Sequence, residues 1–322
     1  MAARYHAMPQ STTYASLFFL LFLTGCSLLQ PAPEKPTAVE TKPAEAIAPE
    51  TPKPPPPKIA LALGGGATRG FAHVGVIKVL EAQGIVPDIV AGTSAGSLAG
   101  ALYAGGYRGI ELQKIAMKIN GDTFGDWILP NRGFIKGESL QNFVNEALNN
   151  RPLEKLSKTF AVVATDLRSG QAVVFRTGNT GIAVRASSSI PGVFQPVNIN
   201  GREYVDGALV SPIPVRAAKN LGADIVIAVD VASKPKSTKV EDTIDILLQT
   251  FNIMSESISA YELAEADVVI RPNVANIGPA DFNQKHIAIL EGEKAALDAI
   301  AAIREKISQY EARWLQKAEE TR

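Results

Sequence analysis

Short apolar runs alternate with longer amphipathic segments from about residue 58 to the end of the chain. An apolar run bounded by turn residues is typical of a buried strand, whereas apolar positions that recur every three or four residues predict a helix. Strands are predicted over residues 58–63, 88–91, 160–165, 172–176, 202–205, 224–231 and 267–271. Helices are predicted over residues 68–83, 95–104, 110–119, 138–148, 181–187, 215–221, 242–264 and 287–317.

This alternation of strands and helices predicts an α/β protein. Parallel strands need long crossover connections, and helices supply them while covering both faces of the sheet. We therefore expect a three-layer α/β/α domain with a mostly parallel central sheet, over residues 58–318. The strand at 267–271 is expected at an edge or as the final strand.

The first 57 residues follow a different pattern. Residues 1–25 resemble an export signal, with positive charge at Arg4 and an apolar run, Leu17–Leu23, that is too short to cross a bilayer of about 30 Å comfortably. Residues 26–57 are rich in Pro, Ala, Glu and Lys. Such a segment cannot bury enough apolar surface to fold, so we expect a semi-rigid tether.

The junction Leu23-Thr24-Gly25-Cys26 resembles the lipobox of bacterial lipoprotein precursors. That resemblance implies cleavage before Cys26 and acylation of this residue; the alternative is a cysteine without such a role. Several acyl chains anchor a protein stably, whereas one chain binds only marginally. By the same resemblance Ser27 favours the periplasmic face of the Gram-negative outer membrane, with the inner membrane as the alternative.

Charge and cysteine content narrow the classes of function. The 322 residues include 32 basic and 32 acidic side chains, whereas a nucleic-acid binder carries a surplus of basic ones. Cys26 is the one cysteine, so no intrachain disulfide and no cysteine-based zinc site can form. We expect no metal and no organic cofactor. Of the three histidines, His6 lies in the predicted signal, which leaves His73 and His286 as candidate bases.

A glycine-rich loop, Gly64–Gly70 (GGGATRG), follows the first predicted strand and opens a helix. Glycines leave backbone N–H groups uncovered, and a helix N-terminus favours negative charge. One interpretation is a phosphate cradle for a dinucleotide. The other is an oxyanion hole, which holds the charge that develops on a carbonyl oxygen during acyl transfer.

A second motif, Gly92-Thr93-Ser94-Ala95-Gly96, fits G-x-S-x-G between a predicted strand and a predicted helix. A nucleophile elbow requires this context, because Gly92 and Gly96 relieve crowding in a strained turn that lifts the Ser94 hydroxyl above the sheet. The dinucleotide interpretation loses ground, since Asp88 stands at the start of the second strand and not at its end. The alternative for Ser94 is an ordinary strand-to-helix turn.

A serine hydroxyl needs a neighbouring base before it becomes a good nucleophile. His286, late in the chain, fits the order of a Ser-His-Asp triad. His73, one helical turn after the glycine loop, is a second candidate. Asp206, before Gly207 at the end of a predicted strand, is a third, because partial burial would raise the pKa of its carboxyl group. Otherwise Asp206-Gly207 is a turn.

Together and in this order, Gly64–Gly70, Gly92–Gly96 and Asp206-Gly207-Ala208 resemble the patatin-like phospholipases, a family that includes plant patatins and the catalytic domain of neuropathy target esterase. The run Arg185–Phe194 (RASSSIPGVF) also looks like the segment that this family carries before its aspartate. The likeness covers roughly residues 58–310.

The resemblance implies a Ser-Asp dyad, in which Ser94 attacks an ester and Asp206 accepts its proton. Ala67 departs from the family pattern, because relatives often have glycine there. The substrate is expected to be a phospholipid or a lysophospholipid. The residues implied for the oxyanion hole are Gly65, Gly66, Ala67 and Arg69, the last of which braces the loop or meets a phosphate.

Two further apolar groups have alternative interpretations. The first group could line an acyl groove or anchor a surface loop; its members are Phe124, Trp127, Ile128 and Phe134. The second group favours core packing over membrane contact; its members are Ile303, Ile307, Tyr310, Trp314 and Leu315. The rival functions are a non-catalytic lipid-binding lipoprotein on the same fold and a dinucleotide-dependent oxidoreductase.

Overall fold

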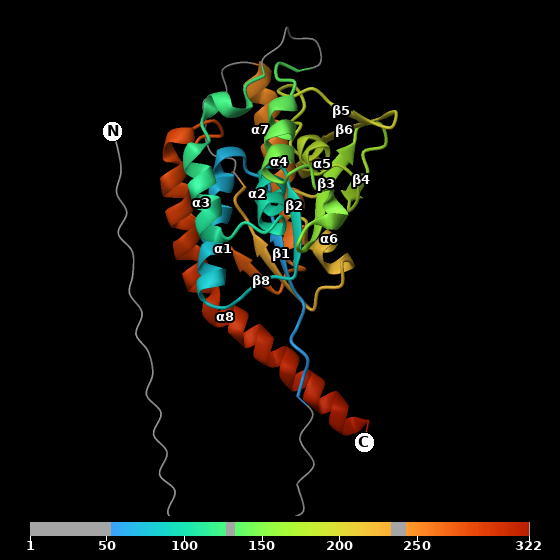
Figure 1. Cartoon of the computed structure of the whole chain (residues 1–322), viewed down its shortest axis with the longest axis vertical. Helices are drawn as coiled ribbons and strands as arrows, with labels where there is room; N and C mark the ends of the chain where they lie inside the picture. Colours follow the sequence, from blue (N-terminus) through green and yellow to red (C-terminus); the bar gives the residue numbers. More distant parts are fainter. Residues whose placement is uncertain (1–52, 127–132, 233–242, 322) are drawn as a thin grey trace, which may run out of the picture. The chain divides into compact units, whose positions relative to one another are not determined.

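The computed structural model describes residues 53–126, 133–232 and 243–321. The predicted signal, Cys26 and most of the predicted tether lie outside the described residues, as do Trp127 and Ile128. The described chain is built on an eight-stranded sheet (Figure 1). Its strands are β1 (Ile59–Leu63), β2 (Ile89–Thr93), β3 (Thr159–Asp166), β4 (Ala172–Phe175), β5 (Val197–Ile199), β6 (Arg202–Asp206), β7 (Ile225–Val229) and β8 (Val268–Ile270).

Five strands are parallel neighbours in the order β3-β2-β1-β7-β8. Strands β4 and β6 pair antiparallel with β3, and β5 pairs antiparallel with β6. The mostly parallel α/β/α fold predicted from the sequence is confirmed. Strand β5 was not predicted, because three residues carry too little periodicity to be recognised.

Helices cover both faces of the sheet (Figure 1). Leu61 and Leu63 of β1 pack in the cluster that includes α1, α2 and α8, whereas Ala60 and Ala62 pack toward α6. This alternation is the period of two expected for a strand buried on both faces. The helices are α1 (Ala72–Ala82), α2 (Ala95–Ala104), α3 (Gly109–Lys118), α4 (Glu138–Ala147), α5 (Thr180–Ser187), α6 (Val215–Asn220), α7 (Thr243–Leu263) and α8 (Lys285–Glu320).

Strand β3 shares one of its edges between two partners. Val163 pairs with both β2 and β4, so those two strands lie on opposite edges. Ala164 pairs with both β4 and β6, so β6 lies opposite β4 as well. Strands β2 and β6 therefore occupy the same edge of β3, one after the other. Because β2 is parallel and β6 antiparallel to β3, their carboxyl ends meet there.

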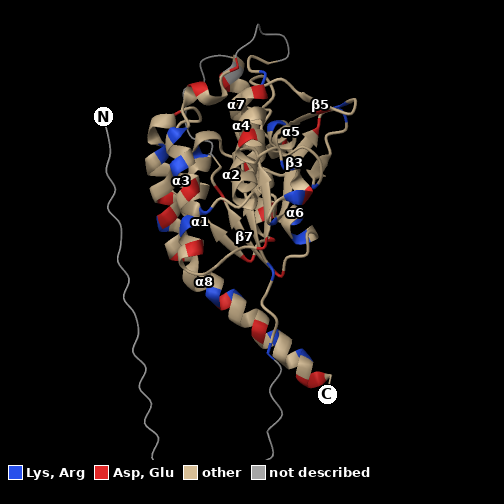
Figure 2. Ribbon diagram, in the orientation of Figure 1, with Lys and Arg blue, Asp and Glu red and all other residues tan. Residues whose placement is uncertain are grey.

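Helix α8 packs along α1 and continues past the sheet at its C-terminal end (Figure 1). Ile303 on α8 is buried, whereas Tyr310, Trp314 and Leu315 are half-buried. Charged side chains are dense along α3 and α8, and the central sheet carries few of them (Figure 2). No helix in the described ranges is long and apolar enough to cross a bilayer.

The close approach of α1 and α8 depends on two glycines. A Cβ on Gly292 would lie 2.0 Å from the carbonyl oxygen of Ala72, and one on Gly75 would lie 2.0 Å from that of Ile289. Only glycine permits this contact between the two helix backbones, because no real Cβ comes so near to a main-chain oxygen.

We predict that Gly292→Ala lowers the free energy of unfolding by about 2 kcal/mol, because overpacking forces the helices apart. This loss should outweigh the gain of about 1 kcal/mol in helix propensity. Chemical denaturation measures the change. Ala302→Val, on an exposed position of the same helix, should stay within about 0.5 kcal/mol of the parent. Equal stability of the two variants would contradict the close packing.

Candidate active site

Ser94 lies in a strained turn between β2 and α2. Its backbone angles, φ 53° and ψ −125°, are unusual for a residue with a side chain and cost on the order of 1–3 kcal/mol. The turn is held from both sides. The Ser94 N–H donates to Ser187 Oγ (2.8 Å), and the hydroxyl of Ser97 donates to the Ser94 carbonyl (2.7 Å).

The glycines of this turn allow tight packing. A Cβ on Gly96 would lie 2.1 Å from the carbonyl oxygen of Leu63, so glycine lets the start of α2 approach the end of β1. Gly92 stands in similar contact with the first turn of α2. The strained strand-to-helix turn that G-x-S-x-G predicts is therefore present in the backbone.

Asp206 ends β6 beside this turn. Its Oδ2 accepts a hydrogen bond of 2.7 Å from Ser94 Oγ, and its Oδ1 accepts one of 2.8 Å from the Ala208 N–H. The Asp206 N–H donates to the Ser189 carbonyl, and the Asp206 carbonyl accepts from the Thr165 hydroxyl. Burial raises the pKa of Asp206 to about 7, although both bonds to its carboxylate act to lower it.

The two candidate histidines lie elsewhere. His73 is buried, and its Nε2 lies 2.8 Å from the Gly64 carbonyl, to which it donates as a neutral ring. Burial lowers the pKa of His73 to about 4, so it stays neutral near pH 7. His286 is exposed in the first turn of α8. Of the three candidate bases, Asp206 is the one whose side chain is hydrogen-bonded to Ser94.

The glycine loop lies against the nucleophile: a Cβ on Gly65 would be 3.2 Å from Ser94 Cβ. The Gly65 N–H donates to the Pro212 carbonyl (3.0 Å), so this predicted oxyanion donor is already used within the fold. The N–H groups of Gly66 and Ala67 have no acceptor among the described residues. Ala67 has φ 50°, a left-handed conformation that glycine adopts more easily.

The rest of the loop is braced from behind. Arg69 is buried, and its Nη1 donates to the Ile277 carbonyl (3.4 Å). The Thr68 hydroxyl donates to the Gly278 carbonyl (2.6 Å). Arg69 thus supports the loop and does not point into the oxyanion position. The other motif glycines also sit in close contacts that a Cβ would disturb: Gly64, Gly70 and Gly207.

A cavity of about 530 Å³ opens at Ser94. No charged side chain of the described residues lines it. It follows one face of α2 from Ala95 to Leu102, a length of about 10–12 Å at the rise of an α-helix. An uncharged cavity of this size and length fits a fatty acyl chain. Its larger side chains include Leu98, Leu102, Ile115, Phe124, Phe194 and Leu248.

Residues 61–219 match the family model of the patatin-like phospholipases. This part of the chain is similar to a patatin-like phospholipase domain. The match spans the glycine loop, the elbow and Asp206, so the three elements assembled around the cavity fall within it.

Relatives of this patatin-like domain occur in bacteria and eukaryotes. An NTE family protein of Mycobacterium tuberculosis is 32% identical over 207 residues, which are 63% of this chain and 57% of that protein. A second one from the same species is 30% identical over 271 residues, 76% of this chain and 46% of that protein. The chain thus spans about half the length of these relatives. A lysophospholipase of Coccidioides immitis is 34% identical over 186 residues, 56% of this chain and 12% of that protein.

Two solved structures are similar at low sequence identity. VipD from Legionella pneumophila has a TM-score of 0.45 and 14% identity, over 80% of this chain and 68% of that one. The type III effector protein ExoU has a TM-score of 0.40 and 15% identity, over 80% of this chain and 54% of that one.

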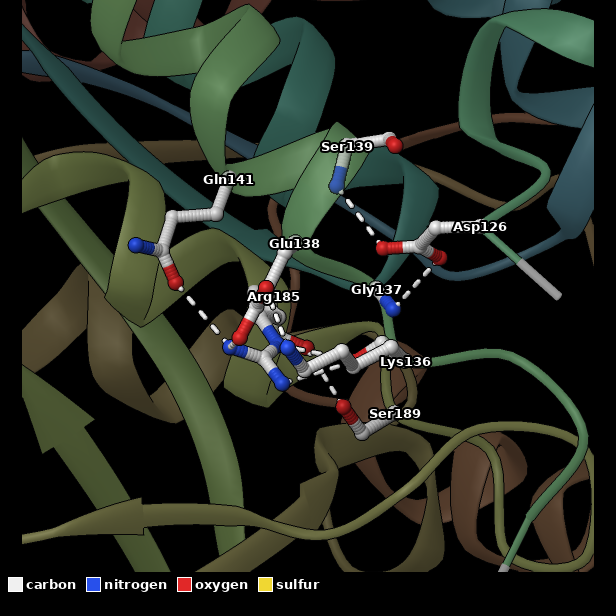
Figure 3. A network of polar contacts seen from close by, with 8 residues as sticks. All are labelled: Asp126, Lys136, Gly137, Glu138, Ser139, Gln141, Arg185 and Ser189. Atoms are coloured by element: carbon white, nitrogen blue, oxygen red, sulfur yellow. Dashed lines mark hydrogen bonds and ion pairs between the residues drawn. The ribbon is translucent and has the colours of Figure 1, made fainter. Parts of the chain in front are cut away.

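The end of α5 connects the patatin-like site to the cavity wall. Ser187 Oγ accepts from the Ser94 N–H and donates to the Val163 carbonyl, so it ties the elbow to β3. Figure 3 shows how Arg185 fixes the other side: Nε and Nη2 donate to the Lys136 carbonyl, and Nη1 donates to Gln141. The segment predicted only by family resemblance, 185–194, therefore holds both Ser94 and the loop that carries Ile135 of the cavity.

A second buried carboxyl group lies behind the site. Glu262 on α7 accepts from the Ser211 hydroxyl and from the Ile213 N–H (2.9 Å). The Ser211 carbonyl accepts from the Thr93 hydroxyl, next to the nucleophile. Burial raises the pKa of Glu262 to about 7. Sequence reasoning placed Ser187 in the family-like segment 185–194 without assigning it a role, and it missed Glu262. Both side chains bond to residues far away in the chain.

The structure describes two of the four residues that were predicted to line an acyl groove or anchor a surface loop. Phe124 lines the cavity, and Phe134 does not, although its neighbour Ile135 does. Trp127 and Ile128 lie outside the described residues. Within the described residues, no group of three or more His, Cys, Asp or Glu side chains is placed to hold a metal ion.

We predict that Ser187→Ala lowers kcat for ester hydrolysis about tenfold or more with little change in KM, because the Ser94 N–H loses its buried acceptor. Ser189→Ala is the matched control, since within the described residues the Ser189 hydroxyl donates to the Arg185 carbonyl and makes no hydrogen bond to Ser94. Initial rates over a range of ester concentrations separate kcat from KM. A change in KM alone, or equal losses in both variants, would contradict a role in positioning the nucleophile.

Proposed function

We propose that this protein is a serine acyl hydrolase that cleaves fatty acyl esters of phospholipids or lysophospholipids through a dyad of Ser94 and Asp206. The observation that carries the proposal is the 2.7 Å hydrogen bond between Ser94 Oγ and the buried Asp206 carboxylate, with Ser94 lining an uncharged cavity. The match of residues 61–219 to the family model of the patatin-like phospholipases supports the same chemistry.

In the first half of the reaction, Ser94 Oγ attacks the ester carbonyl while Asp206 accepts its proton. The N–H groups of Gly66 and Ala67 stabilise the resulting oxyanion, with Gly65 holding the loop in place. Collapse of the tetrahedral intermediate breaks the ester bond. Asp206 returns its proton to the departing alcohol, and the acyl group remains on Ser94.

In the second half, water attacks the acyl-enzyme and Asp206 accepts a proton from it. The same N–H groups stabilise the second oxyanion. Breakage of the acyl–Ser94 bond releases the fatty acid, and the proton returns to Ser94 Oγ. Each proton that Asp206 accepts is thus given back within the same half-reaction.

Two rival functions fit less well. A dinucleotide would need contacts for its phosphates, and the cavity beside the glycine loop carries no charged side chain among the described residues. A non-catalytic lipid binder would not need Ser94 in a strained turn or a carboxylate whose pKa is raised at hydrogen-bonding distance from it.

We also propose that the mature protein is anchored by acyl groups on Cys26 and faces the periplasm. The lipobox-like junction before Cys26 and the proline-rich composition of residues 26–57 support this. Lipid anchoring would keep a phospholipid-cleaving domain close to its substrate.

We predict that Ser94→Ala and Asp206→Asn each lower the hydrolysis of a p-nitrophenyl fatty acyl ester by several orders of magnitude. The double variant should lose little more, because the two residues act as a unit. Ser94→Ala should also abolish labelling by a fluorophosphonate probe.

His73→Gln and His286→Ala are the controls. Both should keep much of the activity, since neither ring reaches Ser94. An inactive but folded His286→Ala protein would favour a triad. Absence of probe labelling in the folded parent would favour the non-catalytic lipid binder.

The pH dependence follows from the raised pKa of Asp206. The base must be ionised to accept the Ser94 proton, so kcat/KM should rise with pH and level off above about 7. Below that value, each unit of pH should reduce the rate about tenfold. A pH profile on a soluble ester measures this. A midpoint near the ordinary pKa of an aspartate would contradict the effect of burial.

A further inference from the structure

Helix α7 has its polar and apolar faces reversed. A surface helix usually buries an apolar stripe and exposes polar side chains. On α7 the side chains of Ser255, Ser259 and Glu262 are buried. Ser255 donates to the Ala208 carbonyl (3.1 Å), and Glu262 accepts from the Ile213 N–H. These bonds fix which face of the helix points inward.

The large side chains on the outward face are apolar, and the smaller Thr250 and Ser257 lie between them. These exposed positions recur every three or four residues, which places them on one face of the helix. Two charged residues of this helix reach its surface: Glu256 is exposed and lies about a third of a turn from the centre of the outward face, and Asp245 is half-buried. We call this face the α7 stripe; its members, with their exposed fractions, are Ile246 (56%), Leu247 (51%), Ile253 (49%), Met254 (47%) and Tyr261 (73%).

The α7 stripe begins at the wall of the acyl cavity. Leu248, the next residue after Leu247, lines the cavity that opens at Ser94. Leu247 Cδ1 lies 3.7 Å from the position that a Cβ on Gly192 would take. Gly192 stands between Ile190 and Val193, which also line the cavity. The exposed apolar surface and the cavity are therefore neighbours.

We propose that the α7 stripe docks the protein on a lipid bilayer, so that an acyl chain passes from the membrane into the cavity. This inference rests on the proposed acyl hydrolase function, which requires such a transfer. A helix that presents an apolar face can lie in the membrane interface with that face buried among the acyl chains. Contact between the α7 stripe and the bilayer lets the acyl chain enter the cavity without crossing water.

The charge of α7 defines the kind of membrane contact. Its exposed surface has no Lys or Arg, so attraction to anionic headgroups does not contribute to docking through this helix. Docking should therefore occur on zwitterionic phosphatidylcholine vesicles and should change little with salt. A second copy of the chain is a less suitable occupant, because it would cover the surface beside the cavity.

Co-sedimentation with phosphatidylcholine vesicles tests the docking. The full chain carries Cys26→Ala, which removes any acyl anchor, and Ser94→Ala, which prevents turnover. Adding Ile246→Asp and Ile253→Asp should weaken vesicle binding about tenfold or more, because two apolar side chains no longer enter the bilayer. The matched control is Leu290→Asp with Leu297→Asp on α8, where the exposed fractions are 48% and 54%. It should bind like the parent.

A second experiment restores Ser94 and compares two substrates. The α7 variant should hydrolyse a soluble short-chain p-nitrophenyl ester at the parent rate, which also shows that it is folded. Its hydrolysis of vesicle phospholipid should fall by the same factor as its binding. If the parent cleaves no ester, the proposed acyl hydrolase function is wrong. The vesicle-binding experiment does not depend on hydrolysis, so it tests docking separately.

Two results would overturn the inference. One is equal vesicle binding by the α7 variant and the α8 control. The other is a parent that sediments as a dimer and becomes a monomer in the α7 variant, since the stripe would then be an interface between copies. Binding that requires anionic lipid and disappears in salt would likewise exclude docking by this uncharged face.

Discussion

The site depends on the way in which β3 gives one edge to two strands in succession. Strand β2 pairs with β3 as far as Val163, and β6 takes over at Ala164. Since β2 and β6 run in opposite directions, their carboxyl ends meet, and Ser94 and Asp206 are the residues at that point. Two neighbouring positions on one strand thus set the distance between the proposed nucleophile and base. No loop has to close to bring them together.

The position of Asp206 at this meeting point explains why a carboxylate is suited to the role of the proposed base, which a histidine fills in other serine hydrolases. The meeting point lies within the sheet, where Asp206 is buried and its ionised form is destabilised. A surface aspartate would be too weak a base near neutral pH, whereas this one is held near the range where proton transfer from serine is efficient. The hydrogen bonds from the Ser94 hydroxyl and the Ala208 N–H limit the rise in the pKa of Asp206 and orient both oxygens of its carboxylate. His73 instead forms a hydrogen bond with the Gly64 carbonyl of the glycine loop.

Local patterns were sufficient to predict the helices and every strand of the described sheet except β5. They were also sufficient for the turn at Ser94, because five consecutive residues, Gly92–Gly96, contain the whole turn. Asp206 was one of three candidate bases by its own pattern, and the family resemblance favoured it. The use of the Gly65 N–H by Pro212 could not be predicted, because it depends on two loops packing across the sheet. The hydrogen bond between Ser187 and the Ser94 N–H could not be predicted for the same reason. The sequence predicted a helix over residues 242–264 but not which of its faces is buried. The hydrogen bonds of its buried polar side chains show that the apolar face points outward.

Those bonds have a physical cause. The segment after Asp206 leaves the sheet, so the Ala208 carbonyl and the Ile213 N–H have no strand partner and are buried. Ser255 and Glu262 on α7 satisfy them, which requires a polar inward face. Nothing in this requirement explains apolar side chains on the outward face, where polar ones would be more soluble at no cost to the core. Because Ala208 also donates to Asp206, one helix supports the proposed base from its inner side and offers the proposed membrane contact from its outer side. A bilayer that orients α7 thereby orients the catalytic edge of the sheet with it.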